Sequence, residues 1–503
     1  MKFRGAATGL LTGLLTGLML AANTGAAPVA TDAMLQQGET LYRSGTSPRN
    51  NPVIAVVAGG TRLPGSAASC AGCHGRDGSG RSEGGITAPD IRWTALTQAG
   101  TRDLAAGRSA KPYDEATLVR AITRGLDSSG NTLAATMPRF ELYGEDLEAL
   151  TAYLKQLHLQ RDPGITDQRI VIGTVLPLTG VAEKQGRALL ALLQAGIDAI
   201  NTRGGLHGRT IAIDAENAES EDAPQRLAAL GQRTLGIVAP YAPRLQAELR
   251  AVARQQVPVV APVMGPEAQG LDPLFSTLPT ARHVLGALAG YWSRLPEQER
   301  GTLTVVLGKV NPEATEEFLR DLLPKAGRYR FVSAQSLLDS GSGPGQWLLL
   351  ETAPGLIQQL GSKLRGSRLL AASTSIAGVP GATLAEVERI VVAAPLLPPR
   401  DDPAMEQMQS RLRELKLEAP PALVTIQAMR GIAVMEEALR RSGRELSRER
   451  LISALENISR METPGGPLSF GARQRAGARG ATLFAMDPSS GRLTLLEPWA
   501  PSL

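Results

Sequence analysis

The chain of 503 residues is long enough for about three domains, each with a hydrophobic core of its own. Its 43% hydrophobic and 20% charged residues are ordinary for a folded globular protein and exclude a largely disordered, collagen-like or fibrous chain. The net charge is only +5 and aromatic residues make up 4%, so we expect no nucleic-acid partner, because such surfaces combine dense basic residues with stacking aromatics.

The N-terminal residues have the three parts of a secretory signal peptide. Lys2 and Arg4 give a positive start, an apolar run covers residues 10–22, and small residues over 24–30 offer cleavage sites. The apolar run is shorter than the roughly 20 residues that a bilayer span needs, and an uncleaved membrane anchor is the alternative. We therefore expect residues 1–30 to be removed and the mature protein to be periplasmic, without stable membrane insertion.

The two cysteines of the chain, Cys70 and Cys73, form with His74 the pattern Cys-Ala-Gly-Cys-His. This spacing lets both thiols add to the vinyl groups of one porphyrin, with the adjacent imidazole beneath the iron as an axial ligand. The alternatives are a redox-active Cys-x-x-Cys pair and half of a zinc site, but zinc needs a second pair of ligands and the other histidines are isolated in the sequence. The motif favours one covalently bound haem c.

The surroundings of the motif resemble a class I monohaem cytochrome c. Gly75-Arg-Asp-Gly78 follows the motif, and farther along the chain comes Thr136-Met137-Pro138-Arg139. In that family a methionine followed by proline is the second axial ligand, so the resemblance implies this role for Met137. Packing in the core is the alternative for any methionine.

The ends of this region resemble the two packed helices of the same family. Leucine and tyrosine residues recur at helical spacing over residues 145–158, which predicts an amphipathic closing helix. The resemblance implies an opening helix in which Gly38 and Tyr42 pack against Tyr153. The residues between this helix and the motif, 44–70, are many more than in a minimal cytochrome, and their Gly, Pro and Asn content predicts an exposed loop.

Beyond residue 168 the pattern changes to alternating strands and helices. We expect a helix at 183–201 and strands at 170–176, 210–213, 235–238, 258–261, 302–307, 347–350, 369–372 and 390–394. Strand, helix and strand in succession form a βαβ unit and imply a parallel sheet.

This second region resembles type I periplasmic solute-binding proteins of the leucine/isoleucine/valine group. The similar residues include Ile170-Val-Ile-Gly173, Pro177-Leu-Thr-Gly180, Gly204-Gly-Leu-His-Gly-Arg209, and, as a last hairpin, Gly465–Phe470 with Thr482–Ala485 and Gly491-Arg-Leu493. The resemblance implies two α/β lobes joined by crossing strands, with a ligand between the lobes. The expected fold class is therefore an all-α cytochrome c domain followed by a two-lobed α/β periplasmic-binding-protein fold with parallel sheets.

Candidate ligand contacts are the residues that directly follow the predicted strands. Ligands of open parallel sheets bind beyond the carboxyl ends of the strands, near helix N-termini. The residues at such places are Thr179, Gly180, Tyr241, Met264, Lys309, Ser373 and Ser375. Each of them has the alternative of being an ordinary loop or capping residue.

Two departures from the family pattern bear on the ligand. Amino-acid-binding members have a hydroxyl-rich turn after the fourth strand, where this chain has Pro262-Val-Met-Gly265, and a Tyr-Asp pair at a late helix, where this chain has Gln427-Ala428. An amino-acid carboxylate would lose charge-assisted hydrogen bonds worth roughly 1.5–3 kcal/mol each. We therefore expect a neutral or less polar small molecule.

These features predict four parts: a signal peptide (1–30), a cytochrome c domain (31–160), a linker (161–168) and a two-lobed binding domain (169–503). We expect an electron-transfer and ligand-binding protein, not a stand-alone enzyme, with a periplasmic dehydrogenase or another cytochrome as redox partner and a small-molecule ligand that gates or couples to the haem. The alternatives are the receptor of an ABC-type permease with a redox-sensing haem, and the accessory electron-acceptor subunit of a periplasmic dehydrogenase.

Overall fold

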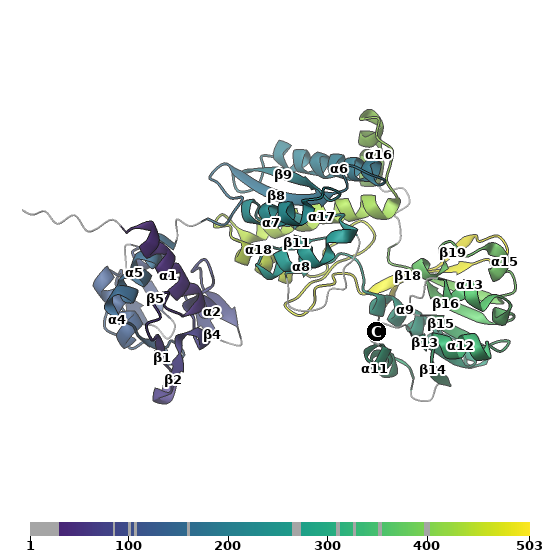
Figure 1. Cartoon of the computed structure of the whole chain (residues 1–503), viewed down its shortest axis with the longest axis horizontal. Coiled ribbons are helices and arrows are strands. Elements are labelled where there is room, and N and C mark those ends of the chain that lie inside the picture. The colour runs from purple at the N-terminus through teal and green to yellow at the C-terminus, as the bar shows by residue number, and fades with distance from the viewer. Residues whose placement is uncertain are drawn as a thin grey trace, which may run out of the picture. The chain divides into compact units, whose positions relative to one another are not determined.

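The computed structural model describes residues 30–83, 86–98, 102–104, 108–157, 161–263, 273–307, 312–324, 328–350, 355–396 and 403–502. The chain divides into two compact units, an N-terminal unit up to Leu159 and a C-terminal unit from Gln160 (Figure 1). The predicted signal peptide, residues 1–30, lies outside the described residues except for Ala30. Within the described ranges, no helix is both long and apolar enough to cross a membrane.

The N-terminal unit has a helical core with short strands between the helices. Its helices are α1 (Asp32–Ser44), α2 (Cys70–His74), α3 (Trp93–Leu96), α4 (Glu115–Arg124) and α5 (Gly144–Gln156). Its strands are β1 (Ile54–Val56), β2 (Arg62–Pro64), β3 (Arg81–Glu83), β4 (Ile86–Ala88), β5 (Arg102–Leu104), β6 (Arg108–Ala110) and β7 (Arg139–Glu141). The predicted opening and closing helices are present as α1 and α5.

Helices α1 and α5 cross at Gly38. A Cβ atom on Gly38 would lie 2.1 Å from the carbonyl oxygen of Ala149 and 2.5 Å from the Cβ of Tyr153, so only glycine allows this approach. Beside it, the ring centroids of Tyr42 and Tyr153 are 5.5 Å apart, and the Tyr42 hydroxyl donates to the carbonyl oxygen of Gly75 at 2.5 Å. The predicted contact is confirmed, and it fixes the helix pair to the residue that follows His74.

Residues 44–70 do not form the exposed loop that their composition predicts. Strand β1 pairs antiparallel with both β2 and β7, which gives a three-stranded sheet of order β2-β1-β7. Val53 and Ala55 are buried in the core of the N-terminal unit. The prediction is wrong because residues 54–56 within an apolar run form a strand, and the surrounding Gly, Pro and Asn residues mark its ends.

The first lobe of the C-terminal unit is a five-stranded parallel sheet of order β12-β11-β10-β8-β9, with helices on both faces (Figure 1). Its strands are β8 (Arg169–Leu176), β9 (Thr210–Asn217), β10 (Ile237–Val238), β11 (Val259–Val260) and β12 (Leu274–Phe275). The core on one face includes α6 (Glu183–Thr202), α17 (Ala422–Ser442) and α18 (Arg448–Glu456), and that on the other face includes α7 (Ala223–Arg233) and α8 (Gln246–Arg254). Ile165, from residues 161–168, is buried in the first of these cores.

The second lobe has a seven-stranded sheet of order β14-β13-β15-β16-β17-β18-β19. Its strands are β13 (Leu303–Leu307), β14 (Tyr329–Ser333), β15 (Trp347–Leu350), β16 (Arg368–Ala372), β17 (Arg389–Ala394), β18 (Gly480–Met486) and β19 (Leu493–Pro501). Strands β13 to β17 run parallel, and β18 and β19 form an antiparallel hairpin that contains the predicted residues 482–485 and Leu493. The predicted residues 465–470 lie outside this hairpin.

Helices cover both faces of this second sheet as well. The core on one face includes α9 (Ala281–Arg294) and α11 (Pro312–Leu322), and that on the other includes α12 (Ala334–Ser340), α13 (Leu356–Leu360) and α15 (Gly381–Leu384). The shorter or more exposed helices are α10 (Glu297–Arg300), α14 (Ser373–Ile376) and α16 (Pro403–Glu414). Every strand predicted in the C-terminal unit is found. Two further strands, β12 and β14, were not predicted because neither has a clear apolar run. Strand β12 has only two residues, and β14 is half-exposed at the sheet edge.

The chain passes between the two lobes three times, at residues 276–280, between β17 and α16, and at residues 471–479, and α16 packs against α6 of the first lobe. The first and third segments pair with each other, because the N–H of Ser276 donates to the carbonyl oxygen of Arg475 and the N–H of Gly477 donates to that of Ser276, both at 2.8 Å. The predicted fold of two α/β lobes joined by crossing segments is therefore present.

We predict that Gly38→Ala lowers the free energy of unfolding of the N-terminal unit by about 1–3 kcal/mol, because the new methyl group would overlap the backbone of α5. Calorimetry of the full chain would show this as a lower midpoint for one transition. The matched control is Gly144→Ala, at the first residue of α5, where an added Cβ has no atom within 4 Å. Equal midpoints for the two variants would contradict the close crossing.

Candidate haem and ligand sites

The Cys-x-x-Cys-His motif forms one short helix, α2. Residues three apart lie on the same side of a helix, so Cys70 and Cys73 present their sulfur atoms to one side. Both are free thiols; Cys73 is exposed, and Cys70 packs against the core of the N-terminal unit. Burial raises the pKa of Cys70 to about 12, which argues against a redox-active pair, because such pairs depend on a cysteine with a lowered pKa.

The imidazole of His74 is buried and held at one of its two nitrogens. Its Nδ1 lies 2.9 Å from the carbonyl oxygen of Pro89, and because a carbonyl can only accept, Nδ1 carries the proton and Nε2 keeps its lone pair. Burial also lowers the pKa of His74, which favours the neutral ring that binds metals. The ring orientation and tautomer are those of a metal-ligating histidine with an outer hydrogen-bond partner.

Met137 lies in the turn before β7, where its N–H donates to the carbonyl oxygen of Ala134 at 3.0 Å. Its side chain is half-buried and packs against the same apolar core as Cys70, Ile91 and Trp93. The thiol of Cys70 and the thioether of Met137 thus pack against one apolar core, and Cys73 and the buried His74 share the short helix of Cys70. This donor set fits haem c. Among the described residues, no group of three or more His, Cys, Asp or Glu side chains is placed to hold a bare metal ion.

The predicted ligand contacts follow strands of both sheets. Thr179 and Gly180 follow β8, and Tyr241 follows the neighbouring strand β10, so these three lie at the carboxyl ends of neighbouring strands in the first sheet. Ser373 and Ser375 follow the carboxyl end of β16 in the second sheet. The other two predicted contacts, Met264 and Lys309, lie outside the described residues.

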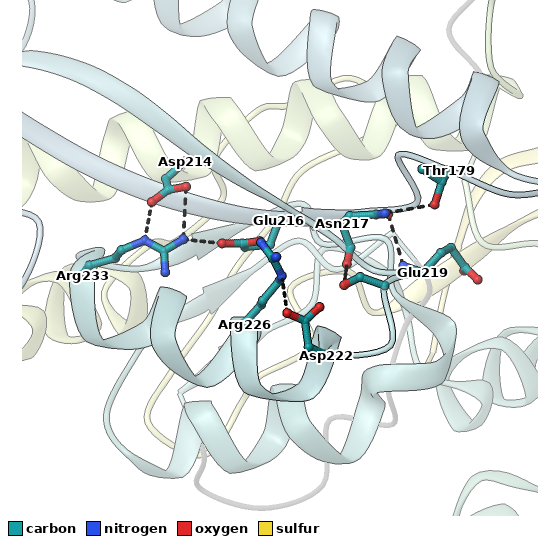
Figure 2. A network of polar contacts seen from close by, with 9 residues as sticks. Thr179, Asp214, Glu216, Asn217, Glu219, Asp222, Arg226 and Arg233 are labelled. Atoms are coloured by element: carbon teal, nitrogen blue, oxygen red, sulfur yellow. Dashed lines mark hydrogen bonds and ion pairs between the residues drawn. The ribbon is translucent and has the colours of Figure 1, made fainter.

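The Thr179 hydroxyl belongs to a network built around Asn217 (Figure 2). Asn217 Nδ2 donates to Thr179 Oγ1 at 2.9 Å, and its Oδ1 accepts from the N–H of Leu178 at 2.9 Å and from that of Glu219 at 3.2 Å. Asn217 is not among the predicted contacts, although it ends β9 directly opposite Leu176, the last residue of β8. The rule that selected Thr179, the carboxyl end of a parallel strand, also selects Asn217. Asn217 therefore sets the position of the loop that carries Thr179.

The rest of this network is a ladder of ion pairs along β9 and α7 (Figure 2). Arg233 contacts Asp214 at 2.6 Å and Glu216 at 2.5 Å, and Arg226 contacts Glu216 at 3.3 Å and Asp222 at 2.8 Å. Hydrogen bonding to Arg226 lowers the pKa of Asp222. Acids and bases pair within the ladder, so it is a solvated face of the lobe and not a charged ligand site.

Ser375 differs from the other candidates because its hydroxyl is buried and unpaired. Its residue is 3% exposed, and its Oγ has no hydrogen-bond partner among the described residues. A buried hydroxyl without a partner costs about 1–3 kcal/mol. Tyr241, in contrast, has its hydroxyl 3.2 Å from Oε1 of Gln185 and its N–H bonded to Val175.

Two buried polar side chains of α17 hold the crossing segments. Gln427 accepts from the Thr277 hydroxyl at 2.8 Å and donates to the carbonyl oxygen of Pro262 at 3.1 Å. Arg430 donates to the carbonyl oxygens of Thr277 and Pro464, both at 2.6 Å, and burial without a carboxylate partner lowers its pKa to about 10. Both side chains therefore bond to Thr277 of the first crossing segment, and each also donates to a backbone carbonyl oxygen of the first lobe.

His283 lies where the first crossing segment enters α9. Its Nδ1 accepts from the N–H of Thr280 at 3.3 Å, and the Thr280 hydroxyl accepts from the N–H of His283, so the two form a capping box. Burial and the nearby charge of Arg479 lower the pKa of His283 to about 4. Protonation would break the Nδ1 hydrogen bond because the nitrogen would no longer accept.

The pKa of His283 gives a pH dependence with a defined sign. The unfolded state binds this proton below a pKa of 6.5 and the folded state only below about 4, so stability is complete above 6.5 and falls as the pH decreases between these values. The ring is partly exposed and water screens its charge, so we predict a loss on the order of 1 kcal/mol. Urea unfolding from pH 7.5 to 4 would measure it, and His283→Gln should flatten this part of the profile. An unchanged profile would contradict the assignment.

Two family models match the chain. The model described as cytochrome c matches residues 60–158, and the model described as periplasmic binding protein matches residues 351–492. No curated protein matches the chain.

Solved structures similar to the chain include three substrate-binding or leucine-binding proteins. A fatty acid ABC transporter substrate-binding protein from Thermomonospora curvata has 17% identity and a TM-score of 0.48 over 68% of this chain and 94% of that chain. A substrate-binding periplasmic protein from Ralstonia solanacearum has 18% identity and a TM-score of 0.47 over 65% and 100%. A leucine-binding protein from Thermotoga maritima has 13% identity and a TM-score of 0.46 over 65% and 97%.

Proposed function

Because the chain joins a cytochrome c domain to a periplasmic-binding-protein domain, we propose that it is a periplasmic electron carrier whose second domain binds a small molecule. The observation that carries this proposal is the buried His74, oriented through Pro89 in a helix that also bears both cysteines. We further propose that residues 1–30 are removed on export, that 31–160 form the haem domain, that 161–168 link the domains, and that 169–503 form the binding domain.

Each predicted haem ligand has a distinct role in this proposal. Cys70 and Cys73 would hold the porphyrin covalently through their sulfur atoms. His74, through Nε2, and Met137, through its sulfur, would hold the iron. When bound, the haem supplies one-electron exchange between ferrous and ferric iron, and a thioether ligand favours the ferrous form and raises the potential.

The ligand in this proposal is a neutral or weakly polar small molecule. Gln427 stands where amino-acid-binding relatives have a Tyr-Asp pair, and both ends of its amide are engaged with Thr277 and Pro262. The hydroxyl of Ser375 is buried without a partner, so a ligand acceptor or donor there would remove an existing cost. An amide that is already bonded and a single buried hydroxyl suit an uncharged polar group better than a carboxylate.

The two sites need not act separately. A ligand that binds the oxidised and reduced forms with different affinity must shift the haem potential, because the two equilibria are linked. We propose that ligand binding tunes electron exchange with a dehydrogenase or another cytochrome in the periplasm. The redox partner would meet the haem domain, and the ligand would report on substrate supply.

We predict that protein matured in its host has gained the mass of one haem, bound through Cys70 and Cys73, and that Met137→Ala loses the charge-transfer band of a methionine-ligated ferric haem. Intact mass spectrometry and visible spectroscopy measure the two. The control is Met34→Ala, a methionine that packs against the same core outside the haem motif. A colourless protein with two alkylatable thiols would refute the haem, and an unchanged Met137→Ala spectrum would refute the axial ligand.

We also predict that the small molecule found with the purified protein by mass spectrometry shifts the haem midpoint potential. Ser375→Ala should need about twofold to tenfold more of this molecule for the same shift, as expected for one neutral hydrogen bond. Ser340→Ala, on an exposed helix end in the same lobe, is the control. A potential that stays constant at saturating ligand would remove the coupling but leave electron transfer intact.

A further inference from the structure

The segment 44–70, which separates the first helix from the haem motif, is joined to the chain that carries Met137. In the three-stranded sheet, β1 lies between β2 and β7, with Ile54 opposite Glu141 and Val56 opposite Arg139. Strand β7 begins two residues after Met137. The backbone directly beyond the proposed iron ligand is therefore hydrogen-bonded to this segment.

Side chains fasten the segment to β7 and to α5. Arg62 on β2 makes a bidentate contact with Glu141 on β7, with both nitrogen-to-oxygen distances 2.6 Å. At the other end, the fully buried carboxylate of Asp146 accepts from the hydroxyl of Ser47 at 3.0 Å and from the amide of Asn51 at 2.9 Å. The segment is thus anchored on both sides of the turn between β7 and α5 and cannot move independently of it.

Apolar packing continues the same connection. Val53 and Ala55 share a buried core with Phe140, the central residue of β7, and Met137 packs against this core. On the other side of Met137, the loop is held where the N–H of Leu133 donates to the carbonyl oxygen of Gly125 at 2.8 Å. Met137 therefore lies between two attached stretches of backbone, and the added sheet supplies the second attachment.

We propose that residues 44–70 are a positioning element that keeps the sulfur of Met137 on the haem iron. This inference rests on the proposed function, in which Met137 is the axial ligand. A thioether is a weak ligand, so the fraction of protein in which it has left the iron depends on how firmly its backbone is held. Pairing of β1 with β7 lowers that fraction, and Arg62 and Glu141 lock the pairing.

Imidazole added to the ferric protein tests this proposal, because it binds only where the methionine has left the iron. Its apparent affinity is therefore proportional to the fraction of the open state. We expect the double variant R62A/E141A to bind imidazole about twofold to fivefold more tightly than the unaltered protein, the range for loss of one exposed ion pair. Val56→Pro, which removes a ladder hydrogen bond on the β7 side of the central strand, should give more than roughly a tenfold increase.

Two matched variants separate positioning from general stability. The exchanged pair R62E/E141R restores the contact and should return the affinity to that of the unaltered protein. Glu115→Ala removes an exposed ion pair outside the segment, to Lys155 on α5 at 2.9 Å, and should leave the affinity unchanged. Equal imidazole affinity for the unaltered protein, R62A/E141A and a folded Val56→Pro would overturn the positioning role, as would an equal increase in Glu115→Ala. Absence of the methionine band in the unaltered protein would instead refute Met137 itself.

Discussion

The hydrogen bond from His74 Nδ1 to the carbonyl oxygen of Pro89 decides what the N-terminal unit can bind. It buries the ring, fixes its tautomer and leaves one nitrogen for a metal, while the same short helix presents both sulfur atoms. The surrounding structure supports this arrangement, since Tyr42, held by the glycine crossing of the first and last helices, bonds to Gly75 directly after the motif. The helix pair therefore holds the motif in the arrangement on which the proposed redox chemistry depends.

In the C-terminal unit, buried polar residues hold the loops that follow parallel strands and the segments that cross between the lobes. Asn217 orders the loop of Thr179, while Gln427 and Arg430 donate to the backbone carbonyl oxygens of Pro262 and Thr277. Buried polar groups of this unit thus fall into two classes. Those of α17 are bonded within the protein, whereas the hydroxyl of Ser375 has no hydrogen-bond partner among the described residues.

Local patterns in the sequence predicted those parts of the structure that depend on neighbours in the chain. The haem motif, the helix pair at Gly38 and the long strands of both sheets have such patterns. The fold of residues 44–70 was not predictable in this way, because its pairing partner β7 lies far along the chain. For the same reason the contact between Asn217 and Thr179 was missed, since it depends on the register of two strands separated by α6. Contacts between distant segments leave no periodic signal in either segment.

The ion-pair ladder on β9 has a consequence for the behaviour of the protein at high concentration. Strand β9 is the edge of its sheet, and an open edge is a template on which another copy can add a strand. Asp214 and Glu216 place charge along this edge, and Arg233 bridges them. An incoming strand would have to displace these pairs and bury their charges. The β9 edge of the first sheet is thereby protected against pairing with a strand of another copy.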